Sequence, residues 1–283
     1  MENNTQGMKQ GALIFAHNSE TLNYLKMSLV SARLVKKNLN VPVCIVTDQY
    51  SLDQTQIDLS QHVDHVVLIP KPAVDNYRNL NNTRHAFING SRHSAWSLTP
   101  FDRTLLIDSD LLIMSDAYSQ YWDSEDFLMC GSMTDLIGNK LSQEEMRVSD
   151  HTIRLRWATA VMFTKNEYTK KIFDTVEFVK REYRYFSDLY EFDSRNFRND
   201  IAFSIAAHIT NGFKEADIFL PSPLFFTDVD NIIDVVDDQL LILATNGSKN
   251  IILPLNGIDI HFLNKKNILE NYDKLMELVC LDT

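Results

Sequence analysis

Short apolar runs alternate with a longer amphipathic stretch in the first part of the chain. The runs 12–16 and 43–46 have the length and composition of strands, and polar residues follow each of them. Between them, apolar residues recur at helical spacing from Leu22 to Leu34. Strand, helix and strand in this order are typical of a sheet with parallel strands that is covered by helices. The pattern therefore predicts an α/β fold.

The same type of pattern continues through the rest of the chain. It predicts strands at 66–69, 104–107, 111–114, 127–130, 160–163 and 258–263, and helices at about 166–185 and 200–210. Neither an internal repeat nor a linker-like stretch interrupts it. We therefore expect one domain over 1–283, with a core at about 11–267 and a C-terminal helix at about 267–280.

Polar side chains follow the first two predicted strands. Ala16, His17 and Asn18 end the first strand, and Asp48 comes directly after the second. Ligands of α/β sheets bind outside the carboxyl ends of parallel strands. We expect these residues to lie at the edge of the sheet where a ligand binds.

Two carboxylates interrupt the most apolar part of the chain, because Asp108 and Asp110 lie between the runs 105–107 and 111–113. An unpaired ionised carboxylate is costly to bury, and two that are close together repel each other. Residues i and i+2 of an extended segment point to the same side, so both could bind one cation. Oxygen ligands suit Mg²⁺ or Mn²⁺ bridging a diphosphate. The alternative is an ordinary aspartate pair that caps a turn.

A histidine and two lysines lie at the end of the last predicted strand. His261 is followed by Lys265 and Lys266. An imidazole can complete a manganese site, and a lysine ammonium can bind a phosphate. The alternative is a core histidine followed by solvated lysines.

Charge and composition narrow the classes of function. Asp and Glu number 38 against 27 Lys and Arg, a net charge of −11, which argues against non-specific coating of nucleic acid or anionic lipid. The window 76–101 has no acid, however, and it contains Arg78, Arg84, Arg92, His85 and His93. Neither glycine-rich phosphate motif is present among the eight glycines, so a nucleotide must be held in another way.

The cysteines and the apolar runs indicate the compartment. Cys44, Cys130 and Cys280 are scattered without metal-site spacing, which predicts free buried thiols in a reducing compartment. The polar start at 1–10 does not have the form of a secretory leader, and charged residues or prolines interrupt every apolar run before membrane-spanning length. We expect a soluble cytoplasmic protein without a membrane partner.

Five segments together resemble a known family. Along the chain they are 14–18 (IFAHN), 92–99 (RHSAWSLT), 105–110 (LLIDSD), 159–163 (TAVMF) and 260–263 (IHFL) with the lysines that follow. In this order they resemble the glycogenin-like, family 8-type branch of the GT-A glycosyltransferases, and the match runs from about 11 to 267. The chain is also similar to phage-encoded transferases of this fold.

The resemblance implies a GT-A fold, a Rossmann-like mixed sheet flanked by helices. It also implies metal-dependent transfer of a hexosyl or pentosyl group from a nucleotide sugar to an acceptor hydroxyl, with Mn²⁺ or Mg²⁺ as cofactor. In this family the donor is usually UDP-linked. The residues at the positions of the family's metal ligands are Asp108, Asp110 and His261. The residues implied at the donor are Ala16, His17, Asn18, Asp48, Arg92, Asp108, Ser109, Lys265 and Lys266. Those implied at the reacting sugar are Asp200, Asn199 and Asp135.

The chain departs from the family pattern at several positions. Asn267 stands where the family has the final lysine of its C-terminal signature, so Lys265 or Lys266 must take that role. Asn199 and Asp200 replace an Asp-Gln pair. No residue supports the self-glucosylating tyrosine of glycogenin.

The acceptor stays open at this stage. Phage relatives suggest the hydroxymethyl group of a modified base in DNA, in the host cytoplasm, and the arginines at 147, 154, 156, 184, 195 and 198 could then contact DNA. The alternatives are a saccharide or protein acceptor, a sugar nucleotidyltransferase, and a non-catalytic sugar-binding protein of the same fold.

Overall fold

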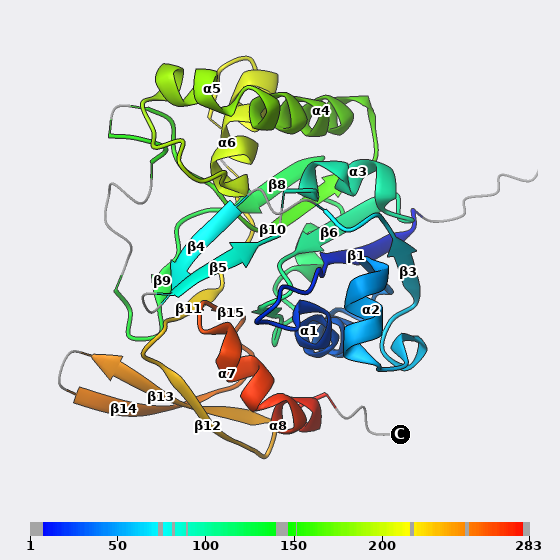
Figure 1. The fold of residues 1–283 in the computed structure, drawn as a ribbon, viewed down its shortest axis with the longest axis vertical. Coiled ribbons are helices and arrows are strands. Elements are labelled where there is room, and N and C mark those ends of the chain that lie inside the picture. The colour runs from blue at the N-terminus through cyan, green and yellow to red at the C-terminus, as the bar shows by residue number, and fades with distance from the viewer. Residues whose placement is uncertain are drawn as a thin grey trace, which may run out of the picture.

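The computed structural model describes residues 8–72, 76–80, 83–88, 90–139, 147–150, 152–215, 218–246 and 249–279. A six-stranded sheet lies at its centre, with strand order β3-β2-β1-β6-β10-β8 (Figure 1). These strands are β1 (Gln10–Phe15), β2 (Val43–Thr47), β3 (His65–Leu68), β6 (Arg103–Ile107), β8 (Phe127–Cys130) and β10 (Trp157–Thr164). The first four are mutually parallel, whereas β10 is antiparallel to both β6 and β8. The predicted α/β fold with a mixed sheet flanked by helices is confirmed.

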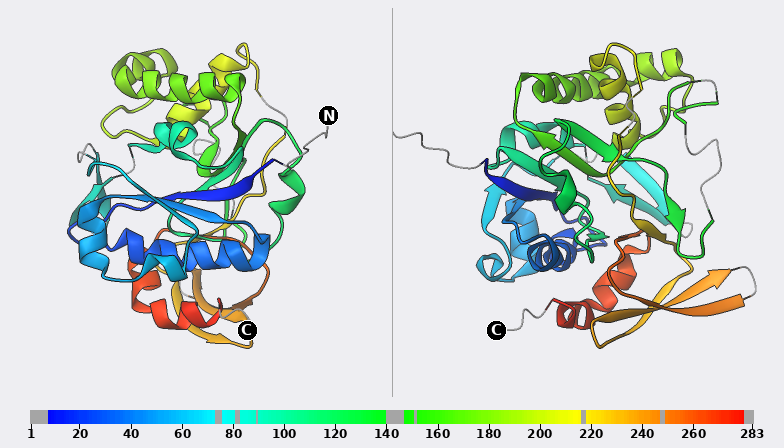
Figure 2. Two further views of the ribbon diagram at one scale, coloured as in Figure 1. Left: turned by 90° about the vertical axis from the view of Figure 1, so that its right-hand side faces the viewer. Right: turned by 180° about the vertical axis from the view of Figure 1, so that it is seen from behind.

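Helices cover both faces of this sheet (Figure 2). They are α1 (Tyr24–Leu39), α2 (Gln49–Thr55), α3 (Ala95–Leu98), α4 (Glu167–Arg181), α5 (Tyr183–Tyr190) and α6 (Asn199–Thr210). Short 3-10 helices are η1 (Leu59–Gln61), η2 (Arg92–Ser94) and η3 (Ser119–Tyr121). A two-stranded hairpin of β4 (Asn76–Leu80) and β5 (Thr83–Phe87) precedes η2.

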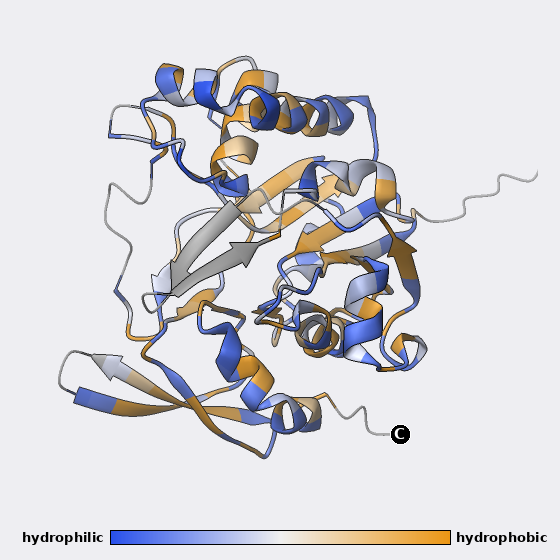
Figure 3. Cartoon of the chain, viewed as in Figure 1, coloured by the Kyte–Doolittle hydropathy of each residue, from blue (hydrophilic) through white to orange (hydrophobic). Residues whose placement is uncertain are grey.

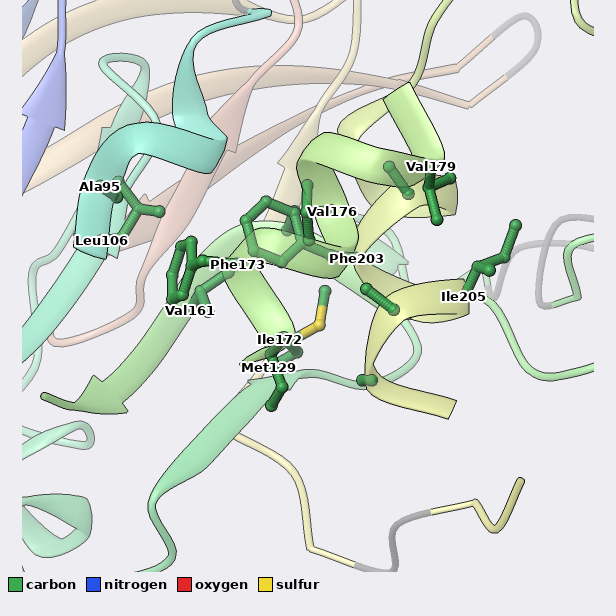
Figure 4. Close-up of a cluster of buried hydrophobic side chains, with 14 of the residues drawn as sticks. Ala95, Leu106, Met129, Val161, Ile172, Phe173, Val176, Val179, Phe203 and Ile205 are labelled. Atoms are coloured by element: carbon green, nitrogen blue, oxygen red, sulfur yellow. The ribbon is translucent and has the colours of Figure 1, made fainter. Parts of the chain in front are cut away.

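The strands alternate their side chains between two cores, as the twofold period of a strand requires. Leu13 and Leu106 belong to the core beneath α4 and α6, which Figure 4 shows in part. Ile14 and Ile107 point to the opposite core, beneath α1. Because both faces of β1, β2, β6 and β8 are buried, these strands read as continuous apolar runs, and most of the central sheet is orange in Figure 3.

Local signals in the sequence set the start of the long helices. Asn166 caps α4, and its side chain accepts from the Thr169 backbone while the Thr169 hydroxyl accepts from the Asn166 backbone. The Asn23 side chain similarly accepts from the backbone of Lys26 at the start of α1. These caps fix the residue at which each helix begins.

Two smaller sheets and two C-terminal helices complete the fold, and their strands at 134–135, 224–226, 231–236, 239–246 and 249–255 were not predicted from the sequence pattern. A second sheet has the order β7-β15-β11-β9, from β7 (Leu111–Leu112), β15 (Ile260–Phe262), β11 (Leu224–Phe226) and β9 (Thr134–Asp135). A third, antiparallel sheet is made of β12 (Asn231–Val236), β13 (Gln239–Asn246) and β14 (Lys249–Leu255). The chain then forms α7 (Lys265–Glu270) and α8 (Tyr272–Glu277). One face of the third sheet packs with these helices and the outer side of α1 in a third core.

Several element boundaries differ from the prediction. The helix expected over 166–185 ends at Arg181 and a separate helix begins at Tyr183. The C-terminal helix is divided at Asn271. The strand expected over 111–114 ends at Leu112, because the Asp259 carboxylate accepts from the backbone N–H groups of Met114 and Ser115.

The predicted buried thiols are confirmed for Cys44 and Cys130, which are free. Burial raises the pKa of each thiol to about 12. Cys280 lies outside the described residues. Within the described part of the chain, none of the helices has both the length and the apolar character needed to cross a bilayer.

Gly11 in β1 provides a test of this packing. A Cβ added there would lie 2.5 Å from atoms of the Phe101 ring, which is itself buried. We expect Gly11→Ala to lower the free energy of unfolding by about 1–3 kcal/mol, the usual cost of overpacking. Gly131→Ala is the control, since its Cβ would meet the Phe219 ring at an ordinary 3.4 Å. Urea denaturation of both variants measures the difference, and equal midpoints would contradict the packing described.

Candidate functional site

One edge of the central sheet collects polar side chains from several strands. Because β1, β2 and β6 are parallel, His17, Asp48 and Asp108 follow them at the same edge. Strand β10 runs the opposite way, so its first residues, Trp157 to Thr159, lie at that edge as well. The sheet topology thus brings together residues that are far apart in the sequence.

The segment from Asp108 to Asp110 is a turn, so the expectation of an extended segment was wrong. The turn joins β6 to β7, and the Leu111 N–H donates to the Asp108 carbonyl at 3.2 Å. Both carboxylates still converge, because the bend directs them toward His261. The predicted grouping of the pair is therefore achieved by a different backbone conformation.

His261 reaches the two aspartates through the second sheet. It pairs with Leu111 in the antiparallel β7–β15 register, and the Phe262 N–H donates to the Asp110 carbonyl. Its Nε2 lies 3.4 Å from Asp110 Oδ1 and 3.7 Å from Asp108 Oδ2. One potential ligand atom from each residue lies within 4.8 Å of the others, so the three residues could hold one metal ion.

Two cations contact the aspartates directly. Arg92 Nη1 donates to Asp108 Oδ1 at 2.7 Å, and the Lys265 ammonium donates to Asp110 Oδ2. Burial raises the pKa of Asp108, although Arg92 opposes the rise. Burial acts in the same direction on Asp110, but Lys265 and His261 outweigh it and hold the pKa of that carboxyl below its usual range.

The formal charges of this cluster balance. Two carboxylates and two cationic side chains sum to zero when His261 is neutral. A divalent cation added among the three ligands would give the cluster a charge of +2, which complements a diphosphate. The donor set of two carboxylate oxygens and one imidazole suits Mg²⁺ or Mn²⁺, so the residues fit such an ion.

A cavity of about 310 Å³ opens beside the cluster. The residues predicted from the sequence that line it are His17, Arg92, Asp108, Ser109, Asp110, Asn199, Asp200, His261 and Lys265. Lining residues that the sequence did not single out are Tyr24, Ile88, Trp157, Asn196 and Phe197. Asn196 and Phe197 precede α6 in an irregular segment, where no periodic sequence pattern indicates which residues face a ligand.

Asp200 lies in the first turn of α6 on the β10 side of the cavity. Its Oδ1 accepts from the Ala158 N–H at 2.9 Å, and its Oδ2 accepts from Arg198 Nη2 at 3.2 Å. These bonds fix the carboxylate between the start of β10 and the start of α6. Asn199 is buried next to it.

Five predicted site residues do not line the cavity. Ala16 is buried, and the Asn18 side chain bonds to Ser51, Thr55 and the Leu25 backbone. Asp48 lies behind His17, and Lys266 is exposed. Asp135 accepts from Asn139 and from the Ile137 backbone, which stabilises the turn after β9.

Asn267, at the position of the family's final lysine, forms hydrogen bonds within the fold and does not line the cavity. Its Oδ1 accepts from the Ile232 N–H at 2.8 Å and its Nδ2 donates to Asn231, which ties β12 to α7. Of the two lysines that could replace the family residue, Lys265 lies in the cavity and Lys266 does not. The sequence could not separate them, because the start of α7 decides which one points inward.

Parts of the chain are similar to solved structures of several transferases. No protein-family model and no curated protein sequence matches it. The galactosyltransferase LgtC, in complex with donor and acceptor sugar analogs, is similar over 68% of each chain, at 13% identity and a TM-score of 0.45. Mouse xyloside xylosyltransferase 1 is similar over 73% of this chain and 84% of its own, at 7% identity and a TM-score of 0.45. The inositol-1-phosphate CTP transferase from T. maritima is similar over the same shares, at 14% identity and a TM-score of 0.41.

The buried ion pair predicts a specific stability effect. Asp110→Asn leaves the buried Lys265 ammonium without its carboxylate partner, so we expect a loss of about 3–5 kcal/mol in the free energy of unfolding. The double variant Asp110→Asn/Lys265→Met removes both charges and should recover most of the loss. Urea denaturation checks this, and a single variant as stable as the wild type would contradict the pairing.

Proposed function

We propose that this chain is a metal-dependent glycosyltransferase of the GT-A type, which moves a sugar from a UDP-linked donor to an acceptor hydroxyl. The observation that carries the proposal is the charge-balanced cluster of Asp108, Asp110, His261, Arg92 and Lys265 on one wall of a cavity at the sheet edge. A bound Mn²⁺ or Mg²⁺ supplies positive charge that stabilises the departing diphosphate.

Arg92 is suited to hold that diphosphate. Its guanidinium is buried, and beyond the bond to Asp108 its Nε and Nη2 atoms have no hydrogen-bond partner within the described part of the chain. Buried N–H donors without partners are costly, and phosphate oxygens would satisfy them. Helix α4 supports this position, since Lys180 donates to the Gly90 carbonyl just before η2.

The end of the cavity at the start of α6, away from Arg92, is suited to the sugar and the acceptor. Asp200 presents a fixed carboxylate there, and Trp157 and Phe197 line the same cavity. A carboxylate in this position can stabilise the positive charge that develops at the anomeric carbon, and Asn199 can bind sugar hydroxyls. We assign Asp135 to its turn rather than to catalysis, because its carboxylate oxygens already accept three hydrogen bonds there.

The contacts of the arginines that could bind DNA help to identify the acceptor. Arg154 pairs with Glu215, Arg195 with Asp193 and Arg198 with Asp200. Arg92 is buried in the cluster, and the side chains of Arg78 and Arg84 lie outside the described residues. These pairings leave less positive charge for a nucleic acid, so they favour a saccharide acceptor over the hydroxymethyl group of a base in DNA.

The donor proposal is tested by incubating the protein with Mn²⁺ and each UDP-sugar while the release of UDP is measured. We expect release with one sugar and loss of at least 100-fold in Asp110→Asn/Lys265→Met, which lacks a metal ligand but keeps the charges balanced. Lys170→Met is a matched control, because this exposed lysine pairs with Asp174 on α4, away from the cavity. No Mn²⁺-dependent release or nucleotide binding with any donor would contradict the proposal.

The acceptor is tested with the active donor and two acceptors, hydroxymethylated DNA and a panel of free saccharides. Mass spectrometry detects the transferred sugar. We expect transfer to a saccharide at a rate that changes little between 50 and 200 mM salt. Transfer only to DNA, falling steeply over the same salt range, would contradict the saccharide preference.

A further inference from the structure

A second cavity, of about 510 Å³, lies at the carboxyl end of β8. Its lining combines charged, hydroxyl and apolar side chains, among them Arg147, Arg154, Ser132, Ser222 and Phe219. None of the described residues that we place at the metal, the diphosphate or the sugar lines it. The proposed donor site therefore does not account for this cavity.

The two arginines of the second cavity are held opposite each other. Arg147 and Arg154 pair in an antiparallel bridge. Side chains directly opposite in such a pair point to the same face, and like charges there repel each other. The neighbouring residues Val148 and Leu155 are buried in the core beneath α4 and α6, which anchors the backbone that carries the arginines. The fold therefore keeps two guanidinium groups together in spite of their repulsion.

The positive charge of this pair is only partly compensated. Among the ion pairs of the described residues, Arg154 contacts Glu215, at 3.5 Å between Nε and Oε2, whereas Arg147 has no carboxylate partner. Arg147 Nη1 donates to the Thr152 carbonyl at 2.6 Å, which orients its guanidinium. The whole chain has a net charge of −11, so its composition does not explain a positive cavity. A carboxylate or phosphate ligand would offset the repulsion, and its oxygens match the guanidinium fork.

The second cavity lies beside the one at the metal ligands. Cys130 at the end of β8 pairs with Trp157 at the start of β10, and the two strands lie side by side (Figure 1). Trp157 lines the first cavity, whereas Gly131 and Leu155, close to this pair in sequence, line the second. Two residues of extended chain span about 7 Å. The separation therefore suits a ligand that extends by about one sugar residue.

Helix α6 fixes the segment that runs between the two cavities. The Arg156 N–H donates to Ser204 Oγ at 2.8 Å, and the Ala158 N–H donates to Asp200 Oδ1 at 2.9 Å. Asp200 is the residue that we place at the reacting sugar. The same bonds thus set the position of the second cavity relative to the reacting end of the first.

Building on the proposed function, we propose that the second cavity is a subsite for an acidic acceptor saccharide. Arg147 and Arg154 bind a carboxylate or phosphate group of this acceptor, one sugar residue away from the hydroxyl that receives the transferred sugar. The Phe219 ring provides apolar surface for a sugar ring, and Ser132 and Ser222 provide hydroxyl groups. One pair of arginines suits one anionic group rather than the row of phosphates in DNA, so the dependence on salt stays weak.

The binding of glucose, glucuronate and glucose 6-phosphate tests the subsite directly. NMR titrations with Mg²⁺ and UDP present measure the three affinities for the wild type, Arg147→Gln and Arg184→Gln. We expect the wild type to bind at least one of the two acidic sugars about fivefold or more tightly than glucose, and Arg147→Gln to lose this preference. The acidic sugar that is preferred identifies the anionic group as a carboxylate or a phosphate.

Arg184→Gln is the matched control. This exposed arginine of α5 lines neither cavity, and its replacement removes the same charge, so the preference for the acidic sugar should remain. Arg147 is also exposed, and we expect its replacement to leave the fold intact. Equal binding of the three sugars by the wild type, or a preference that Arg147→Gln retains, overturns this inference alone.

The transfer reaction tests whether the subsite serves the acceptor. With the active donor, we expect an acidic disaccharide to have a kcat/KM about tenfold above that of its neutral counterpart, and Arg147→Gln to remove this advantage mainly through KM. A preference for the neutral disaccharide overturns the inference. Duplex DNA that binds more tightly than either acidic sugar, and does so through Arg147, overturns it as well. Selective binding of an acidic sugar by a protein that releases no UDP from any donor overturns the proposed function, and the acceptor role with it.

Discussion

The neutralisation of two carboxylates at the end of a buried strand is the constraint on which the site depends. Asp108 and Asp110 follow β6, which is buried on both faces, so their charges cannot be left to water. Arg92 comes to them from η2 and Lys265 from the start of α7. The C-terminal segment with Lys265 must therefore dock against the segments at 92 and 108–110 before the centre of the fold is stable.

The need to neutralise Asp108 and Asp110 also explains the role of the short strands and helices near the C-terminal end of the described chain. Strand β15 is only three residues long, yet its pairing with β7 places His261 beside the aspartates. Asp259 ends β7 by accepting from the backbone of Met114 and Ser115, and Asn267 ties the following helix to β12. The third sheet thus acts as a support that holds the C-terminal residues of the site against the central sheet.

Much of this arrangement could be predicted from the sequence, because buried strands are unbroken apolar runs and the polar residues at their ends are easily seen. The pairing of Asp108 with Asp110 followed from this pattern, whereas the addition of His261 to the pair rested on the family resemblance. The turn at 108–110 could not be predicted, since it depends on a backbone bond from Leu111 to Asp108. The strands between 224 and 255 were missed, although β11, β13 and β14 are apolar segments without an acidic residue. Trp157 and Phe197 were missed because only tertiary packing directs them into the cavity.

A crystal soaked with Mn²⁺ and UDP, measured at a wavelength where manganese scatters anomalously, tests the central claim most directly. We expect one anomalous peak within bonding distance of Asp108, Asp110 and His261 Nε2, with the diphosphate on its open side and the Lys265 ammonium moved away from Asp110. Manganese bound elsewhere, or a cluster that keeps its Lys265–Asp110 contact with no metal between the three ligands, would contradict it.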